Sequence, residues 1–433
     1  MPEERPAPVG QPLIHDSALR HCTGDALYID DMPDFPDALH VALVTSPLPH
    51  AHIGAIRAGR AVDVPGFVAL LNAHDIPGVN DVGPIHAEPC LAETIADYVG
   101  CPVAAVVAES LAAAQQAAAL VECDYETLPP ILSIREALDA KSFIGEPMVM
   151  TSGDSAAALA ASPHRLSGEI ETGGQDHFYL ETQIALAVPR EAGEMTIYSS
   201  TQHPNEVQRK VATVLGLPSA AVDVEVRRLG GGFGGKESQA TIFAAIAALA
   251  AWKTRRPAKL RLPRDTDMAV SGKRHDFHIV YEVGFDGDGR ILGLDITLAS
   301  RAGNVADLSG PVMTRALCHI DNCYFLPALK ATGYLCKTHT VSNTAFRGFG
   351  GPQGMIAIEA ILDRIARRLG KPLEQVRRRN FYGPAPRDAT PYGQTVDDNI
   401  APQLVERLLA AADVARRREK IAADNRTSPV IKR

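Results

Sequence analysis

A run of glycines in the middle of the chain is the segment best suited to bind a ligand. Residues 230–237 read Gly-Gly-Gly-Phe-Gly-Gly-Lys-Glu and lie between a strand-like segment and an Ala-rich helical one. Glycine permits positive φ angles and lets a ligand approach the backbone closely. Amide groups at the start of a helix favour an anionic or oxo ligand. The run therefore predicts a loop that presents backbone N–H groups to such a ligand.

Two nucleotide-binding patterns fit this run incompletely. Gly230 and Gly235-Lys236 satisfy G-x-x-x-x-G-K, but Glu237 replaces the Ser or Thr that would hold magnesium, and its charge would repel phosphates. The run also matches G-x-G-x-x-G, yet residues 253–260, about 20 positions later, contain no acid to bind a ribose. A P-loop-like nucleotidase therefore remains a remote alternative.

Several other reactive side chains have an ordinary structural explanation when they are read alone. Glu237 fits a charge at a helix N-terminus, Arg315 a surface cation and Phe349 a core aromatic. The pair His50 and His52 fits surface or core positions better than metal ligation. A chemical role for these residues can be argued only from the motifs in which they stand.

The cysteines argue against a metal cluster or a disulfide framework. The chain has 7 cysteines and no C-x-x-C pair. An odd number without close pairs does not fit a disulfide scaffold, a zinc ribbon or an iron–sulfur cluster held by this chain alone. Buried thiols in a reducing compartment are expected instead.

Size and charge limit the remaining classes. A chain of 433 residues is too long for one hydrophobic core and predicts two or three domains. The net charge of −8 disfavours nucleic acid or an anionic membrane as a partner. The first fifteen residues lack the apolar centre of a signal peptide, and the longest apolar run, Ile242–Trp252, is too short to cross a bilayer. A cytoplasmic location is expected.

The first part of the chain alternates short strands with helical segments. Strands are predicted at residues 40–45, 103–108 and 121–126, with a helix at residues 111–120. A helix between two strands predicts a compact α/β unit over residues 22–127. Pro129-Pro130 then interrupts the pattern and suggests a domain boundary in the loose segment that follows.

The second part carries a hairpin and two helices. Strands at residues 279–285 and 291–297 flank Asp286-Gly-Asp-Gly, a strong hairpin signal. Residues 353–369 are amphipathic and stop at Gly370, a typical helix end. One more helix is predicted over residues 404–423.

Five motifs stand in order along the chain, at residues 173–182, 200–204, 230–237, 315–324 and 342–353. They resemble those of the xanthine dehydrogenase and aldehyde oxidase family of molybdenum hydroxylases. Ser46-Pro and Tyr98-Val-Gly-Cys-Pro-Val also resemble the family's N-terminal domain. Five ordered motifs over nearly the whole chain make coincidence negligible.

The resemblance implies an α/β (α+β) protein with a defined domain order. Residues 1–20 are expected to be a leader and residues 21–140 an α/β hammerhead-type domain. Residues 141–425 are expected to be the first molybdopterin-binding domain, and residues 426–433 a stub.

For the cofactor, the resemblance implies a molybdenum–molybdopterin bound without a side-chain ligand to the metal. The dithiolene sulfurs of the pterin hold molybdenum in the family, which fits a chain without a His/Cys cluster. Gln202 matches a glutamine that donates toward an oxygen on the metal, and Phe233 a residue whose backbone amide approaches the metal's ligands. The full set implied to line the cofactor is Gln202, Gly232, Phe233, Gly234 and Arg347.

For the substrate, the resemblance implies a purine bound by Glu237, Arg315 and Phe349. Attack on an electron-poor ring carbon drives negative charge into the heterocycle, and a fixed guanidinium opposite that charge lowers the barrier. A carboxylate can accept ring N–H groups, and an aromatic ring packs on the purine face. Aldehyde oxidases lack the Glu and Arg together, so purine is favoured over aldehyde. The resemblance also implies that the cofactor-binding and substrate-binding residues share one concavity. It should be lined by Gln202, Phe233 and Arg347, with Glu237, Arg315 and Phe349 along one wall.

The implied activity is oxidative hydroxylation of hypoxanthine and xanthine to urate in purine catabolism, with NAD or oxygen as final acceptor. The family's glutamate base lies beyond Arg433, so the chain is expected to be a fragment that is inactive alone. The 2Fe-2S clusters and FAD are expected in a partner small subunit within a hetero-oligomer. The alternative is an inactive truncated chain that serves only to dock a partner.

Overall fold

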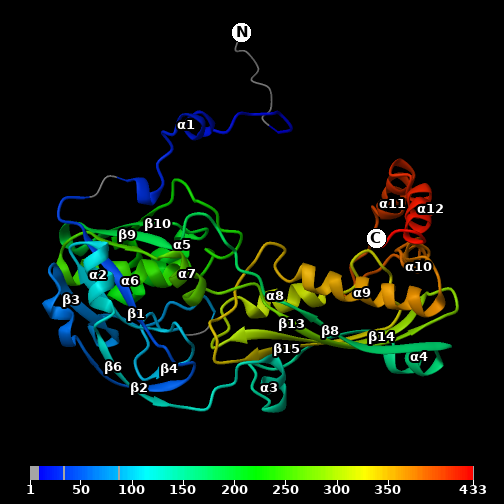
Figure 1. Cartoon of the computed structure of the whole chain (residues 1–433), viewed down its shortest axis with the longest axis horizontal. Helices are drawn as coiled ribbons and strands as arrows, with labels where there is room; N and C mark the ends of the chain where they lie inside the picture. Colours follow the sequence, from blue (N-terminus) through cyan, green and yellow to red (C-terminus); the bar gives the residue numbers. More distant parts are fainter. Residues whose placement is uncertain (1–8, 33–34, 86–87, 433) are drawn as a thin grey trace, which may run out of the picture. The chain divides into compact units, whose positions relative to one another are not determined.

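The computed structural model of the protein describes residues 9–32, 35–85 and 88–432. Residues 1–8 of the expected leader and Arg433 of the expected stub lie outside this range. The chain forms two compact units (Figure 1). Unit 1 comprises Met1–Pro130, Asp176–Lys273 and His339–Ala345, and unit 2 comprises Ile131–Gln175, Arg274–Thr338 and Phe346–Arg433. Each unit is therefore built from segments that are distant in sequence.

Unit 1 contains a mixed seven-stranded sheet with the strand order β11-β10-β9-β12-β1-β5-β3. Its strands are β1 (Leu39–Thr45), β3 (Phe67–Asn72), β5 (Pro102–Ala108), β9 (Ile184–Pro189), β10 (Met195–Ser199), β11 (Val222–Glu225) and β12 (Ala258–Arg261). The predicted strands 40–45 and 103–108 are confirmed as β1 and β5. The sheet extends beyond the predicted unit of residues 22–127. Strand β1 pairs in parallel with β12, and Leu39 lies opposite Ala258. That pairing satisfies backbone groups that an exposed edge of β1 would leave open.

Helices α5 and α6 pack together and form the core of unit 1 with the β9 side of the sheet. The unit's α-helices are α1 (Ala18–Thr23), α2 (Leu111–Ala118), α5 (Pro204–Leu215), α6 (Ala240–Thr254) and α7 (Arg264–Val270). Helix α6 is apolar all round and is buried from Ala240 to Ala251, as expected of a helix inside a large core. A small sheet of β4 (Ile95–Ala96), β2 (Ala51–Arg57) and β6 (Glu122–Thr127) completes the unit.

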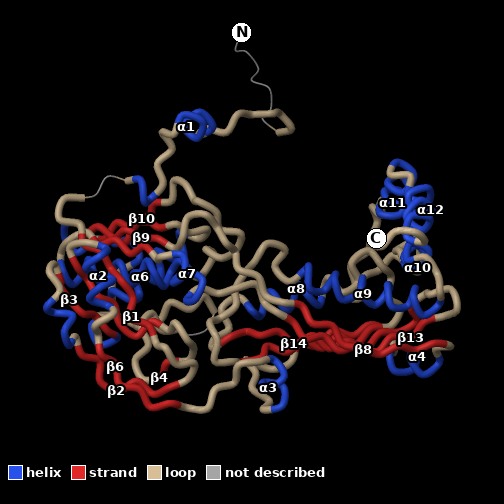
Figure 2. Tube along the Cα trace, in the orientation of Figure 1, coloured by secondary structure: helices blue, strands red, loops and turns tan. Residues whose placement is uncertain are grey.

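Unit 2 is a five-stranded sheet with helices on both faces (Figures 1 and 2). Its strands are β7 (Met148–Ser152), β8 (His164–Thr172), β13 (Phe277–Phe285), β14 (Ile291–Gly303) and β15 (Leu329–Lys337), in the order β7-β15-β14-β13-β8. Its first helices are α3 (Ile134–Asp139), α4 (Ser155–Ala161), α8 (Ser309–Leu317), α9 (Gly351–Leu369) and α10 (Leu373–Asn380). Helices α8 and α9 cover one face, and α3 and α4 lie on the other.

Local signals in unit 2 are confirmed. Strands β13 and β14 form the predicted hairpin, and Asp286 Oδ1 accepts hydrogen bonds from the amides of Asp288 and Arg290 at 2.9 Å each. Helix α9 ends at Gly370, which has a φ of 64° and frees the chain from the helix.

The predicted single helix over residues 404–423 is wrong. The structure has two helices there, α11 (Ala401–Ala411) and α12 (Val414–Asn425), separated at Asp413, which has a φ of 47°. Neither helix has a buried residue. Packing therefore does not enforce a continuous helix, and the side chain of Asp413 pairs with Arg416 one turn later.

The seven cysteines are all free thiols, as expected. Burial is confirmed for Cys90, Cys101 and Cys336, but Cys22 is exposed, so the expectation of buried thiols is wrong for that residue. Among the described residues, no helix combines the length and the apolar character needed to span a bilayer.

Candidate functional site

In unit 1, Gln202 holds the glycine loop, defined as residues 230–237. The amide of Gly234 donates to Gln202 Oε1 at 2.8 Å, and the Gln202 amide donates to the Lys236 carbonyl at 2.8 Å. The first bond fixes the orientation of the side-chain amide. The Nε2 amino group makes no hydrogen bond to any other described residue. Gln202 is exposed, so this amino group is available as a donor.

The loop has no room for larger residues where it contacts its supports. A Cβ atom at Gly232 would lie 2.4 Å from Gln202 Oε1, and one at Gly235 would lie 2.6 Å from His177 Cγ. Gly230 is equally confined, since a Cβ atom there would lie 2.2 Å from Glu181 Cβ. Glycine is therefore a packing requirement at Gly230 and Gly235, whereas a larger residue at Gly232 would displace the flexible end of the Gln202 side chain.

Phe233 occupies the tip of this loop in a strained conformation. Its φ is 54°, between Gly231 at 96° and Gly234 at 102°. A non-glycine residue in this region costs roughly 1–2 kcal/mol and persists only where its surroundings impose it. The Phe233 side chain is 49% exposed, so the strain does not serve burial.

Lys236 points inward from the loop. The side chain is fully buried, and Nζ donates to the Glu181 carbonyl and to Ser200 Oγ, both at 2.7 Å. Burial lowers the pKa of Lys236 to about 8, although the Glu181 carboxylate, 3.3 Å away, opposes that shift. A lysine held in this way cannot reach a phosphate, which argues against the nucleotidase alternative. Sequence reasoning considered Lys236 only within the phosphate-binding pattern and missed this buried role.

Glu237 ends the loop with a half-buried carboxyl group. Burial raises the pKa of Glu237, His203 lowers it and Glu206 raises it. His203 Nδ1 lies 2.8 Å from Glu206 Oε2, and Glu206 is buried. Sequence reasoning missed His203 and Glu206, although both closely follow Gln202 in the chain.

In unit 2, the structure brings together the elements that carry Arg315 and Phe349. Arg315 lies in the last turn of α8, and Phe349 lies in the turn before α9. A Cβ atom at Gly350 would lie 2.1 Å from the Val312 carbonyl of α8, so the turn packs directly on that helix. Phe349 has a φ of 52°, and its amide donates to the Phe346 carbonyl at 2.7 Å.

The two predicted arginines are exposed cations. Neither Arg315 nor Arg347 has a carboxylate within ion-pair distance among the described residues. Several other exposed arginines of the chain do pair with Asp or Glu, as Arg57 does with Asp124 at 2.6 Å. The two guanidinium groups are therefore available to an external partner.

The predicted site residues divide between the two units. Gln202, Gly232, Phe233, Gly234 and Glu237 belong to unit 1, and Arg315, Arg347 and Phe349 belong to unit 2. Within each unit the residues are brought together as described. The expectation that all of them line one concavity stays a prediction.

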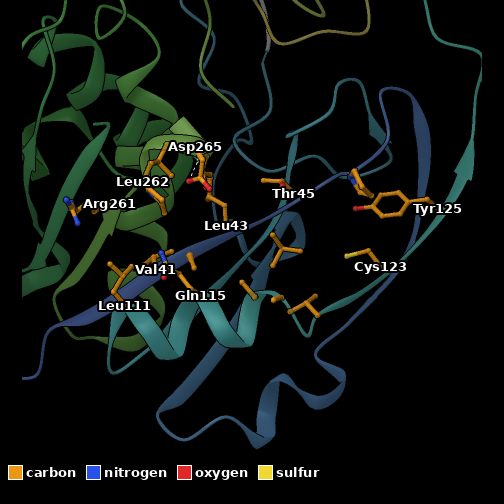
Figure 3. A pocket seen from close by; sticks show the side chains of 18 residues that line it. Val41, Leu43, Thr45, Leu111, Gln115, Cys123, Tyr125, Arg261, Leu262 and Asp265 are labelled. Atoms are coloured by element: carbon orange, nitrogen blue, oxygen red, sulfur yellow. Dashed lines mark hydrogen bonds between the residues drawn. The ribbon is translucent and has the colours of Figure 1, made fainter. Parts of the chain in front are cut away.

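Two cavities of unit 1 differ in their relation to the glycine loop. One of about 790 Å³ lies between β1, α2, β6 and residues 261–266, as Figure 3 shows, and contains none of the predicted site residues. Another of about 760 Å³ is lined by the loop residues Gly230, Gly231 and Phe233, with Phe178 and Leu180. The second cavity is the one that adjoins the candidate site.

A third feature of unit 1 is a group of possible metal ligands. Ligand atoms of His50, Asp97 and His339 lie within 4.8 Å of one another. The two imidazole rings are stacked, with centroids 3.7 Å apart and an interplanar angle of 24°. Nitrogen lone pairs lie in the ring planes, so those of nearly parallel rings do not converge on one ion. We assign no metal to this group.

Two family models match the chain. Residues 23–129 match the aldehyde oxidase and xanthine dehydrogenase a/b hammerhead domain, and residues 139–381 match the molybdopterin cofactor-binding domain. The chain belongs to the aldehyde oxidase and xanthine dehydrogenase family. The predicted fold class and order of domain types are thereby confirmed.

Curated relatives carry the name of one branch of this family. The chain is 42% identical over 426 residues to the xanthine dehydrogenase/oxidase of Gallus gallus, and the match covers 98% of the chain and 31% of that relative. It is 40% identical over 423 residues to the xanthine dehydrogenase of Dictyostelium discoideum, covering 97% of the chain and 31% of that relative. The chain therefore spans about a third of the length of these relatives.

Solved structures share the fold. The aldehyde oxidoreductase from Desulfovibrio gigas matches with a TM-score of 0.86 and 25% identity, over 96% of this chain and 47% of that one. The quinoline 2-oxidoreductase from Pseudomonas putida matches with a TM-score of 0.85 and 26% identity, over 95% of this chain and 55% of that one.

Proposed function

We propose that this chain supplies residues for the molybdenum cofactor and for a purine to an enzyme that converts hypoxanthine and xanthine to urate in purine catabolism. The observation that carries the proposal is the arrangement of Gln202, whose Oε1 is bound by Gly234 while its amino group is left as a donor. The xanthine dehydrogenases at 40–42% identity support purine over aldehyde, since the aldehyde oxidoreductase is only 25% identical.

The loop and its surroundings fit the proposed cofactor. A side chain at Gly232 would displace the Gln202 amide, and the groups beside the loop are amides rather than metal ligands. Backbone and side-chain N–H groups suit oxo and phosphate oxygens. We assign Gln202, Gly232, Phe233 and Gly234 of unit 1 and Arg347 of unit 2 to the molybdopterin. When bound, the cofactor supplies the oxidising centre that removes two electrons from the substrate carbon.

Glu237, Arg315 and Phe349 are the proposed purine-binding residues. The unpaired guanidinium of Arg315 stabilises negative charge that develops in the ring. Burial raises the pKa of Glu237, and its half-buried carboxylate can accept a hydrogen bond from a ring N–H. Phe349, held in a fixed turn, offers an aromatic face to the ring.

The remaining parts of the reaction belong to the whole protein. We propose a cytoplasmic hetero-oligomer in which a partner small subunit carries 2Fe-2S clusters and FAD and passes electrons to NAD or oxygen. Family membership supports this arrangement, and no residue of the chain is assigned to these groups.

The decisive experiment separates the two functions of the Gln202 amide. In the complete protein, Gln202→Glu keeps an acceptor for the Gly234 amide but removes the donor, whereas Gln202→Ala removes both. Loss of one preorganised donor lowers turnover on the order of 10²-fold. We expect both variants to lose xanthine turnover to this extent, measured per bound molybdenum. Gln208→Ala, on helix α5, which begins two residues after Gln202, is the control. Turnover of Gln202→Glu within a few-fold of wild type contradicts the proposal.

A further inference from the structure

Arg274 is a half-buried guanidinium of unit 2 that lacks a counter-ion. Burial alone lowers the pKa of Arg274, and no carboxylate contributes to the shift. Its Nη1 atom is buried and makes no hydrogen bond to any described residue. By contrast, Arg301 in the same unit pairs with Asp276 at 2.9 Å. A partly buried cation without a carboxylate is costly, so charge neutralisation is not the role of Arg274.

The other nitrogens of Arg274 are used in directional contacts. Nε donates to Gln175 Oε1 at 2.7 Å, and Nη2 donates to the Arg347 carbonyl at 3.0 Å. The guanidinium carbon also lies 3.8 Å from the centre of the Phe346 ring. Arg274 thus contacts two successive residues where the chain enters the turn before α9.

That turn has positive φ at three successive positions, of which only Phe349 is strained by it, because the other two are glycines. Gly348 has a φ of 96°, Phe349 of 52° and Gly350 of 100°. An L-residue such as Phe349 keeps a left-handed conformation only where the surroundings impose it. Helix α8 supplies one support, since Gly350 packs against the Val312 carbonyl. Arg274 supplies a second by binding the peptide group that joins Arg347 to Gly348.

We propose that Arg274 is a positioning residue that fixes the turn of residues 346–350 and thereby directs Arg347 and Phe349. The bond to the Arg347 carbonyl sets the orientation of the peptide just before the left-handed residues. The stacking on Phe346 holds the chain at the entrance of the turn. The consequence for catalysis rests on the proposed function, in which Arg347 faces the cofactor and Phe349 packs on the purine.

The turn itself provides a direct test on the 433-residue chain. We expect Arg274→Gln to speed hydrogen exchange at the amides of Phe349 and Gly351, which close the turn, by about tenfold or more. Arg274→Lys keeps the charge but not the fork of N–H groups, and we expect an intermediate rate. Exchange within β13 reports whether each variant is folded.

Arg364→Gln is the matched control. Arg364 also belongs to unit 2, and its guanidinium donates to the Glu169 carbonyl at 2.9 Å and to Tyr281 Oη at 2.7 Å. We expect this variant to leave exchange in residues 346–351 unchanged. Wild-type exchange in a folded Arg274→Gln chain, or equal acceleration in Arg364→Gln, overturns the inference.

Turnover of the complete, molybdenum-loaded protein separates this inference from the proposed function. We expect Arg274→Gln to lower kcat/KM for xanthine by about tenfold at unchanged molybdenum content. Faster exchange with unaltered kcat/KM upholds the positioning of the turn but contradicts the proposed roles of Arg347 and Phe349. Lowered kcat/KM with wild-type exchange overturns the positioning role and leaves the proposed function standing.

Discussion

The Oε1 atom of Gln202 accepts a hydrogen bond from the Gly234 amide at 2.8 Å, and a Cβ atom at Gly232 would lie 2.4 Å from the same oxygen. One side chain therefore holds the glycine loop and would have to move if a larger residue replaced Gly232. The position of Gln202 and the conformation of the glycine loop therefore depend on each other, which leads to the first prediction.

Gly232→Ala is expected to displace the Gln202 side chain. The added methyl group overlaps Oε1 of the exposed Gln202 side chain, which must leave the Gly234 amide, and loss of that hydrogen bond costs about 1 kcal/mol. We expect a lower melting temperature of the chain and, in the complete protein, loss of xanthine turnover comparable to that of Gln202→Ala. Gly173→Ala is the control, because a Cβ atom there meets nothing within 4 Å. Equal behaviour of the two variants argues against the confined geometry.

Lys236 makes the stability of unit 1 depend on pH. Its folded pKa of about 8 lies below the usual value of 10.5, so the folded state loses the proton before the unfolded state does. The penalty for burying the charge is complete below pH 8 and is relieved as pH rises toward 10.5. Each pKa unit corresponds to about 1.4 kcal/mol, which gives a gain on the order of 3 kcal/mol across this window.

Lys236→Met removes this dependence. Denaturant unfolding of both proteins from pH 7 to pH 10 gives the difference in free energy of unfolding. We expect wild type to gain stability relative to Lys236→Met as pH rises. The exposed Lys420, replaced by Met, serves as the control. A difference that stays flat with pH, or moves in the opposite direction, shows that the buried ammonium group is not destabilised as inferred.

Arg315→Met and Glu237→Ala in the complete protein are expected to damage purine turnover far more than folding. Arg315 is exposed and unpaired among the described residues, so its replacement removes charge stabilisation without breaking an ion pair. Each change should cost on the order of 2–4 kcal/mol in transition-state stabilisation. Steady-state kinetics with xanthine and a thermal melt of each variant provide the measurement. A lower melting temperature with turnover within a few-fold of wild type identifies a structural role instead.

Much of the local structure follows from the sequence alone. The β13–β14 hairpin, the end of α9 at Gly370 and the extended conformation of β1 depend on turn chemistry and periodicity over a few residues. The exposed pair α11 and α12 shows the limit of this reasoning, because nothing in the apolar pattern marks the break at Asp413. Without burial on either helix, a small local preference decides where the chain turns.

The sequence by itself therefore determined the family motifs, the glycine loop and the types of residue that serve it. Only the tertiary structure decided that β1 pairs with β12, that Lys236 points into a buried network and that Arg274 binds the Arg347 carbonyl. The physical reason is the range of the interactions. Periodicity and turn signals act between near neighbours, whereas these contacts join residues far apart in the chain, and their energy exists only once the surrounding core has formed.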